Sequence, residues 1–512
     1  MIGPVATLLR FARSPHRSRD GFRSWQILFA AVPAFFLHEA ACAETGAAIS
    51  LTDSIRNVLR ADNDAIRLQD ERVATASANV KTAGGAFDWA AQAQGGWQAL
   101  YVPRAQYGVV PGKGVLTNNT DILSAYYYST SIGREFRNGI QIAPGITAYP
   151  STSGATTAQT FGLTALRPSF GLRIPLLQGL GEEAADSAEL SAKATLTGTR
   201  FDRDFAIAHT VHDVVQIYWR CIAADKIAHI SAQSLRNGDE YSSSLKLLAQ
   251  KGFTEPTVAQ QYAAANATRK VSLDQNQDAV LSCRRDLALA TTGRAIGETP
   301  APAGDLPGME GLDAAVAALS ELQLDDLALN NRSDLKAARE YIAAALATRR
   351  GTEDSKSPVL SLQIDPTRAI VSYTQSLEND AAEGRDAAAL SSQRQAEIAL
   401  HQLENQVQVD IGDAVRNLRT ALSEWKSASE AERQTEAVVS EGEKRVRLGV
   451  LDRKDLLVAK DQLTQIQSQA VNAQLLFVSS VATLRLVSGT VHPEQETPAA
   501  SAAKFATLPG SG

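Results

Sequence analysis

The stretch Arg445-Val446-Arg447-Leu448-Gly449-Val450-Leu451-Asp452-Arg453-Lys454-Asp455 decides the fold of this 512-residue chain. On both sides of it, apolar residues recur every three or four positions, which is the spacing of an amphipathic helix. These residues are Val407, Ile411, Ala414, Leu418, Ala421 and Trp425 before it, and Leu463, Ile466, Ala470, Ala473, Phe477, Val481 and Leu484 after it. Gly449 permits the positive φ at which one helix ends and the next reverses. The stretch therefore predicts a helical hairpin that turns at Gly449.

The same arrangement occurs earlier in the chain, around Lys251-Gly252-Phe253-Thr254-Glu255-Pro256-Thr257-Val258. Apolar stripes flank this second turn as well: Ile207, Val211, Val214, Tyr218 and Cys221 before it, and Leu273, Val280, Cys283 and Leu287 after it. Further upstream, residues 63–67 correspond to residues 332–336. Internal duplication of this kind defines architecture before any single motif does. We expect two structural repeats, residues 44–293 and 324–490, joined by a linker at 294–323.

Each repeat is expected to contain a short helix, a β-hairpin, a long helix, a turn and a second helix. The first repeat has its hairpin at about 86–175, its long helix at 182–250 and its second helix at 255–292. The second repeat has a short hairpin at 359–376, a long helix at 384–448 and a second helix at 453–488. Helices of this length suit a coiled-coil bundle or a barrel of packed helices. Residues 491–512, rich in Ala and Ser with two prolines, are expected to be a disordered tail.

The extended segments carry a different pattern. From Phe87 to Tyr101, apolar or small residues alternate with polar ones such as Asp88, Gln92 and Gln94. Alternation over ten or more residues is typical of a transmembrane strand, although an ordinary half-buried hairpin has the same pattern. A partner strand is expected at 159–175, with a large extracellular loop at about 102–159 that has room for small strands of its own. The second hairpin is short, so either the sheet is shallow there or its strands extend past 359–376.

The N-terminus has the features of an export signal, residues 1–43. Five arginines precede the apolar run Trp25–Leu37, and Ala41-Cys42-Ala43 follows as a cleavage pattern. Glu39 stands where a lipobox has Leu, which argues against lipidation of Cys42. The whole chain carries a net charge of −6; the segment removed holds five Arg, Asp20 and Glu39, a net of +3, which leaves −9. An acidic exported chain is not a nucleic-acid binder. No internal apolar run approaches the roughly 20 residues of a spanning helix, which argues against an inner-membrane transporter.

Two cysteines remain after the signal, Cys221 and Cys283, and both are 31 residues from Gly252. Equidistant residues of an antiparallel helical hairpin lie side by side, and the periplasm is oxidising. The spacing leaves two alternatives open, a disulfide between the two helices or a pair of buried free thiols.

Motifs for catalysis are missing from the sequence. His209 and His212 have a spacing that can bind metal on a helix, but no third ligand is near, so packed or solvated histidines are the better interpretation. The sequence has no phosphate-binding glycine loop, nucleophile elbow or cysteine cluster. We therefore expect neither an enzyme nor a cofactor nor a bound metal.

The two helical turns and the repeats around them resemble a known family, the TolC-type outer-membrane channels of tripartite efflux and type I secretion systems. The resemblance is carried by 445–459, by its weaker copy at 251–258, by 327–335 before the second hairpin and by 174–181, and covers roughly residues 50–490. It implies an α+β, mainly α fold and a homotrimer in the outer membrane. Each protomer would give four strands to a shared twelve-stranded β-barrel and its helices to a periplasmic α-barrel. The competing class is a structural coiled-coil protein anchored at the outer membrane, with no conduit.

The resemblance also implies partners and sites. The turns would form a tip that docks a periplasmic adaptor (membrane fusion) protein, which in turn meets an inner-membrane pump of the RND, ABC or a similar class. The docking residues would be Lys251, Gly252, Phe253, Thr254, Leu448, Gly449, Val450 and Leu451. Asp455, Val458 and Val258 would form the pore gate. Because Val458, Val258 and Leu451 stand where the family often has charged residues, we expect apolar contact plus one ring of Asp455. Asp455 has a second interpretation, as a first-turn acid that favours the helix dipole.

Overall fold

Long helices make up most of the structure. The computed structural model describes residues 48–60, 63–110, 113–149, 165–293, 301–308 and 311–509. The predicted export signal lies outside these residues. From Gly46 onward the chain forms one unit.

The first repeat begins with two helices, α1 (Leu51–Val58) and α2 (Asp64–Gly84), and a 3-10 turn, η1 (Gly85–Phe87). Four strands follow: β1 (Ala90–Val110), β2 (Lys113–Glu135), β3 (Gln141–Tyr149) and β4 (Ala165–Pro175). The chain then enters the short α3 (Glu182–Ala185), the 64-residue α4 (Ser187–Gln250) and α5 (Pro256–Thr292). At 1.5 Å per residue, α4 is about 96 Å long.

The second repeat is preceded by the short α6 (Leu312–Ala317), which lies in the expected linker, and begins with α7 (Glu321–Asn331), most of which lies within the expected range 324–490. It contains α8 (Ser333–Asp354), the strands β5 (Val359–Asp365) and β6 (Arg368–Thr374), the 68-residue α9 (Asp380–Arg447) and α10 (Arg453–Val487). Helix α11 (Pro498–Phe505) follows. Helices α4 and α9 occupy the two ranges in which the sequence predicts a long helix.

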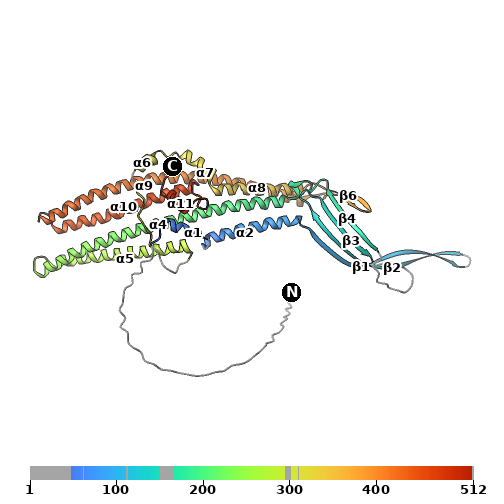
Figure 1. Cartoon of the computed structure of the whole chain (residues 1–512), viewed down its shortest axis with the longest axis horizontal. Coiled ribbons are helices and arrows are strands. Elements are labelled where there is room, and N and C mark those ends of the chain that lie inside the picture. The colour runs from blue at the N-terminus through green and yellow to red at the C-terminus, as the bar shows by residue number, and fades with distance from the viewer. Residues whose placement is uncertain are drawn as a thin grey trace, which may run out of the picture. The chain divides into compact units, whose positions relative to one another are not determined.

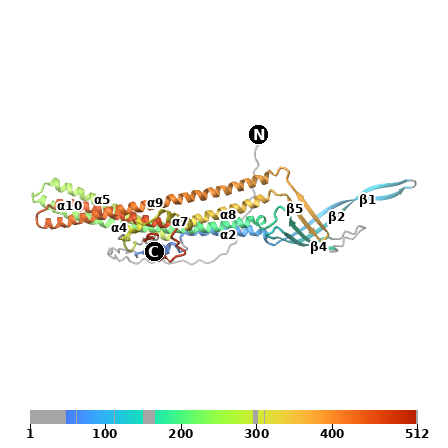
Figure 2. The same cartoon turned by 90° about the horizontal axis from the view of Figure 1, so that it is seen from above.

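The two helical hairpins run side by side, with α4 against α5 and α9 against α10 (Figures 1 and 2). Contacts between α10 and α4 join one hairpin to the other, and α8 packs on both α4 and α9. The main core lies where α1, α7 and α11 cover the middle of the hairpins. Its largest buried side chains include Trp219, Phe477, Ile411, Leu418 and Phe505. The strands lie at one end of the long helices, and the turns at 251–255 and 448–452 lie at the other (Figures 1 and 2).

The C-terminal segment belongs to this core, so the prediction of a disordered tail at 491–512 is wrong for the described residues. Phe505 and Leu508 are 0% and 1% exposed. The guanidinium of Arg485 donates hydrogen bonds to the backbone carbonyls of Thr507 and Leu508 at 2.8 and 2.6 Å. Thr497 caps α11 by accepting from the N–H of Ala500, and Pro498 occupies the first turn. Apolar burial and backbone hydrogen bonds thus hold a segment whose composition suggested disorder.

All six strands form one antiparallel sheet in the order β1-β2-β3-β4-β5-β6. Where the resemblance implied four strands, the described residues form six. Within the expected extracellular loop at 102–159, residues 113–135 and 141–149 form the strands β2 and β3. The chain returns to the helix end of the sheet between these strands. The second hairpin has seven residues in each strand, fewer than the nine to eleven of a tilted transmembrane strand, so the sheet is shallow there.

Helix α10 is an exception to the prediction that no internal segment is long and apolar enough to span a membrane. It is the one described helix that is long and apolar enough to cross a membrane by length and composition. Half of its apolar window is buried inside the unit, however, and Phe477, Val481 and Leu484 belong to the core. Its hydropathy is that of a core helix.

Candidate functional site

The two helical turns have the same backbone geometry. In the first, Gly252 has φ 74°, and the N–H of Phe253 donates to the carbonyl of Leu248 at 2.9 Å. In the second, Gly449 has φ 75°, and the N–H of Val450 donates to Arg445 at 2.9 Å. Both are Schellman motifs, in which a left-handed glycine lets the last carbonyls of a helix find donors. The duplicated glycines therefore perform the same local function in both repeats.

The turns present large apolar side chains to solvent. Phe253, Leu448 and Val450 are 76%, 77% and 76% exposed. Asp452 caps α10 by accepting from the N–H of Lys454 at 3.2 Å, so the chain leaves the second turn in a defined direction. We call residues 251–255 and 448–452 the tip. Exposed apolar residues on rigid turns are typical of a surface that binds a partner.

A groove of about 1060 Å³ lies between the two hairpins next to the tip. Tyr241, Leu245 and Leu248 of α4 line one side, Val258 and Tyr262 of α5 another, and Asp452, Arg453 and Lys454 its remaining edge. The rings of Tyr241 and Tyr262 meet edge to face with centroids 4.9 Å apart. Burial, with a smaller effect of the neighbouring Tyr262, raises the pKa of Tyr241. The groove is thus apolar along the helices and charged at its mouth.

One ion pair joins the two hairpins above this groove. Arg269 of α5 reaches Asp461 of α10, with Nε 3.1 Å from Oδ1 and a second, closer contact through Nη2. The Arg269 side chain is only 15% exposed. Sequence reasoning missed this pair, because it joins segments 192 residues apart that meet only once the hairpins pack.

The predicted gate residues differ in their surroundings. Asp455 and Val458 lie on the exposed side of α10, and Val458 is 56% exposed. Val258 is half-buried and lines the groove. The structure therefore brings Asp455 and Val458 together on one helix face and places Val258 elsewhere.

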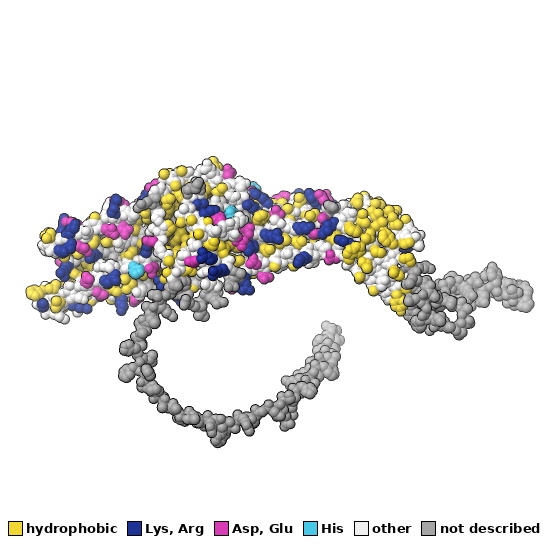
Figure 3. Space-filling view, in the orientation of Figure 1, with side chains coloured by type: hydrophobic (Ala, Val, Ile, Leu, Met, Phe, Trp, Pro, Cys, Tyr) yellow, Lys and Arg dark blue, Asp and Glu magenta, His cyan; other side chains and the backbone are white. Residues whose placement is uncertain are grey.

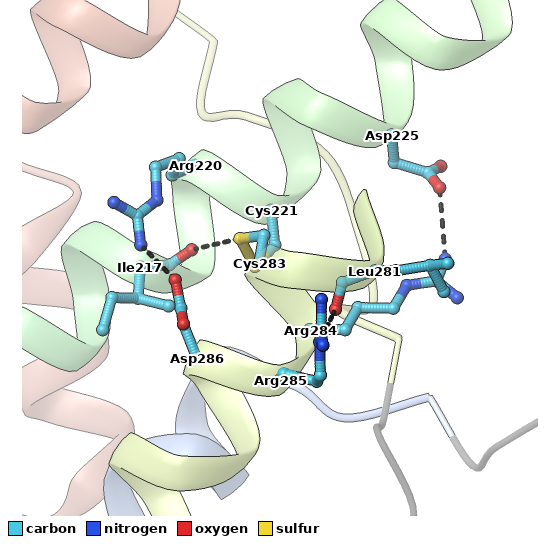
Figure 4. Close-up of a disulfide and its surroundings, with 9 residues drawn as sticks. All are labelled: Ile217, Arg220, Cys221, Asp225, Leu281, Cys283, Arg284, Arg285 and Asp286. Atoms are coloured by element: carbon cyan, nitrogen blue, oxygen red, sulfur yellow. Dashed lines mark hydrogen bonds and ion pairs between the residues drawn. A yellow bond between two sulfur atoms is a disulfide. The ribbon is translucent and has the colours of Figure 1, made fainter. Parts of the chain in front are cut away.

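The helices of the first hairpin are covalently joined. Cys221 of α4 and Cys283 of α5 form a disulfide with their Cα atoms 5.4 Å apart (Figure 4). Of the two alternatives for these residues, the structure contains the disulfide. On either side of it, Arg220 pairs with Asp286 and Arg284 with Asp225, each at 3.2 Å. These ties make α4 and α5 one rigid element far from the tip.

The histidines form a small polar cluster. His209 lies 3.1 Å from Asp213, and His212 contacts Gln216 and Thr483. Burial lowers the pKa of His212 despite its hydrogen bond with Asp213. Within the described part of the chain, no group of three or more His, Cys, Asp or Glu side chains could hold a metal.

The sheet has one apolar and one polar face. Side chains of directly paired residues share a face. The exposed large apolar side chains of the described strand residues all lie on one face: Trp97, Tyr128, Ile132, Ile146, Phe170, Val371 and Tyr373. Each of these seven is more than 40% exposed. Figure 3 shows hydrophobic side chains gathered over the strands beside the helix ends. The opposite face carries Gln92, Ser131, Ser169, Arg173 and Gln363.

This combination of a strand sheet, long helical hairpins and duplicated turns defines the fold class of the TolC-type outer-membrane channels. No protein-family profile matches the chain, and no curated protein matches it in sequence. Solved structures match it over most of its length. The outer-membrane channel OprN matches with a TM-score of 0.64 and 15% identity, over 86% of this chain and 90% of its own.

Two further structures are from named organisms. The outer-membrane channel CmeC of Campylobacter jejuni has a TM-score of 0.62 and 11% identity, over 90% of both chains. The open-state MtrE outer-membrane channel of Neisseria gonorrhoeae has a TM-score of 0.59 and 14% identity, over 90% of this chain and 98% of that one. The predicted mainly α, TolC-type fold is confirmed by these matches.

Proposed function

We propose that the chain is the outer-membrane channel component of a tripartite efflux or type I secretion system. Three copies would form a passive conduit, with the sheets in the outer membrane and the helices in the periplasm. The conduit would be opened by a periplasmic adaptor and supplied by an inner-membrane pump. The shared fold of the outer-membrane channels OprN, CmeC and MtrE supports this function.

The two-faced sheet is the observation that carries the proposal. An exposed apolar face suits lipid, and a polar opposite face suits water. Among the described residues, β1 and β6 each pair with only one strand, so both edges of the sheet have free backbone groups. An open edge is not tolerated in lipid, and a single six-stranded sheet does not close. Assembly of several copies into a barrel satisfies both requirements.

The tip is the proposed docking site for the adaptor. Its exposed apolar residues, Phe253, Leu448 and Val450, lie next to the groove between the hairpins, and Lys251, Thr254 and Leu451 complete the two turns. A helical hairpin is the kind of partner that inserts apolar residues into a groove of this form.

The gate is proposed at Asp455 and Val458, which share the exposed side of α10. In a trimer, three copies of this face would meet near the axis and narrow the pore. Val258 is in the groove instead, so its contribution would be to pack the hairpins against each other.

Planar-bilayer recording on the purified protein tests the proposal. Discrete current steps that disappear when the tip is cross-linked would support a conduit. If ordered oligomers reconstitute into the bilayer but neither the natural protein nor an Arg269→Ala variant conducts ions, the structural coiled-coil alternative is correct.

A further inference from the structure

In the four-stranded arrangement implied by the resemblance, β2 and β3 are not part of the barrel wall, because residues 102–159 would be a loop outside the membrane. In the structure, the turn between them, Phe136–Ile140, lies at the opposite end, against the helices. The N–H of Gly139 donates to Phe136 at 2.8 Å, and the N–H of Gly181 donates to Asn138 at 3.4 Å. Gly139 has φ 84°, and a Cβ there would lie 2.0 Å from the carbonyl oxygen of Gly179. The turn is therefore seated closely against the corner where β4 leads into α3.

An ion pair holds this turn on the long helix. Arg137 donates two hydrogen bonds to the carboxylate of Glu189 in the first turn of α4, at 2.8 and 3.0 Å. The Glu189 side chain is 6% exposed and also pairs with Lys193 at 2.8 Å. The Arg137 guanidinium lies 5.0 Å from the centre of the Phe87 ring, at the entry to β1. The β2–β3 turn is thus joined to the elements before and after the sheet.

The faces of β2 and β3 continue those of their neighbours. Ala91 of β1 pairs with Ile132, and Thr130 pairs with Ile146, all on the apolar face. Ile132 and Ile146 are 52% and 51% exposed there. On the polar face, Gln92, Ser131, Gly145 and Ser169 form one row across four strands. A one-residue shift in the pairing would move every apolar side chain of a strand to the opposite face. A loop folded over the mouth of a barrel would not need its apolar and polar residues to match the faces of the barrel wall, as those of β2 and β3 do.

We propose that β2 and β3 are part of the membrane wall, so that each copy contributes six strands and the trimer encloses an eighteen-stranded barrel. This inference rests on the proposed function, because it assumes that three copies close one barrel. The edges that must pair between copies are β1 and β6. Barrel diameter grows roughly in proportion to strand number, so the opening is about 1.5 times as wide as that of a twelve-stranded barrel. The polar row at Gln92, Ser131 and Ser169 faces the water inside it.

Site-directed cysteine labelling in intact cells tests this arrangement, because the native Cys221 and Cys283 are already bonded to each other. Ile132→Cys and Ile146→Cys probe the apolar face, and Ser131→Cys and Thr147→Cys probe the polar face. Ala91→Cys and Gln92→Cys on β1 are the matched controls, since β1 is a wall strand in both arrangements. Each variant is first checked for trimers in detergent; if Ile132→Cys fails, Thr130→Cys replaces it, and if Ser131→Cys fails, Ser129→Cys replaces it.

The expected result is that the polar-face cysteines react with a membrane-impermeant maleimide at least tenfold faster than the apolar-face cysteines, as the two β1 controls do. Equal reaction at all four β2–β3 positions, with the β1 controls still different, would overturn the six-stranded wall and leave the channel proposal intact. Loss of the difference at the β1 controls as well would overturn both.

Discussion

Arg269 on α5 and Asp461 on α10 form an ion pair that joins the two helical hairpins near the tip, with Nε and Oδ1 3.1 Å apart. The hairpins otherwise meet there across a groove of about 1060 Å³. A pair that ties the two hairpins together next to this groove resists their separation. If the tip is the gate of a conduit, this pair stabilises the closed form.

Arg269→Ala is expected to shift the tip toward an open form. A hydrogen-bonded charge pair contributes about 1.5 kcal/mol, which corresponds to about a tenfold change in the ratio of open to closed. Planar-bilayer conductance and open probability measure this shift. Arg284→Ala is the matched control, because Arg284 pairs with Asp225 inside the first hairpin at 3.2 Å and does not join the two hairpins. Equal open probability in the two variants would contradict a gating role for Arg269.

The ion pair between Arg137 and Glu189, which holds the β2–β3 turn on α4, is expected to depend on pH. Hydrogen bonds from Arg137, and then from Lys193, lower the pKa of Glu189 from 4.5 to about 2. Because the folded pKa is lowered, the stabilisation is fully present above pH 4.5 and is lost as the pH falls toward 2. Thermal unfolding midpoints of the natural protein and Glu189→Gln should therefore differ most above pH 4.5 and converge at lower pH. A constant difference across this range would show that Glu189 acts through packing alone.

The disulfide is expected to stabilise the first hairpin. It closes a sequence separation of 62 residues, for which the loss of chain entropy in the unfolded state corresponds to about 4 kcal/mol. The Cys221→Ala/Cys283→Ala variant should unfold at a lower temperature by circular dichroism. A reductant should lower the midpoint of the natural protein toward that of the variant and leave the variant unchanged. If the reductant has no effect on the natural protein, the bond does not contribute to stability.

Substitutions at Phe505 test whether the C-terminal segment packs in the core and stabilises the protein. Its side chain is fully buried against the main core, where His212 is its ring neighbour at 6.5 Å. Phe505→Ala should destabilise the protein by about 3–5 kcal/mol, and Phe505→Leu by much less. Susceptibility of residues 491–509 to proteolysis would rise in parallel. An alanine variant as stable as the natural protein would mean that the segment leaves the core in solution.

Features encoded locally were predictable from the sequence. The turns at Gly252 and Gly449 follow from a helix-compatible pattern on each side of a glycine, which needs no knowledge of distant residues. The spacing of Cys221 and Cys283 about Gly252 narrowed their chemistry to two alternatives because a helical hairpin has a simple register.

Features that depend on distant partners were missed. A strand is indicated by the alternation of Tyr128, Thr130 and Ile132 with Ser129 and Ser131. The place of this strand in the sheet, however, depends on the β2–β3 turn, which the distant Glu189 holds through Arg137. Ala502, Phe505 and Leu508 recur at helical spacing after the Thr497-Pro498 start, but Ala and Ser dominate the composition. The Arg269–Asp461 pair required the packing of two hairpins from different repeats.

The most direct test of the central claim is the native mass of the purified full-length protein in detergent, since the sheet closes only if several copies share it. The account predicts three copies in one particle, with strand signal by circular dichroism. A monomer under conditions that preserve its helices would contradict it.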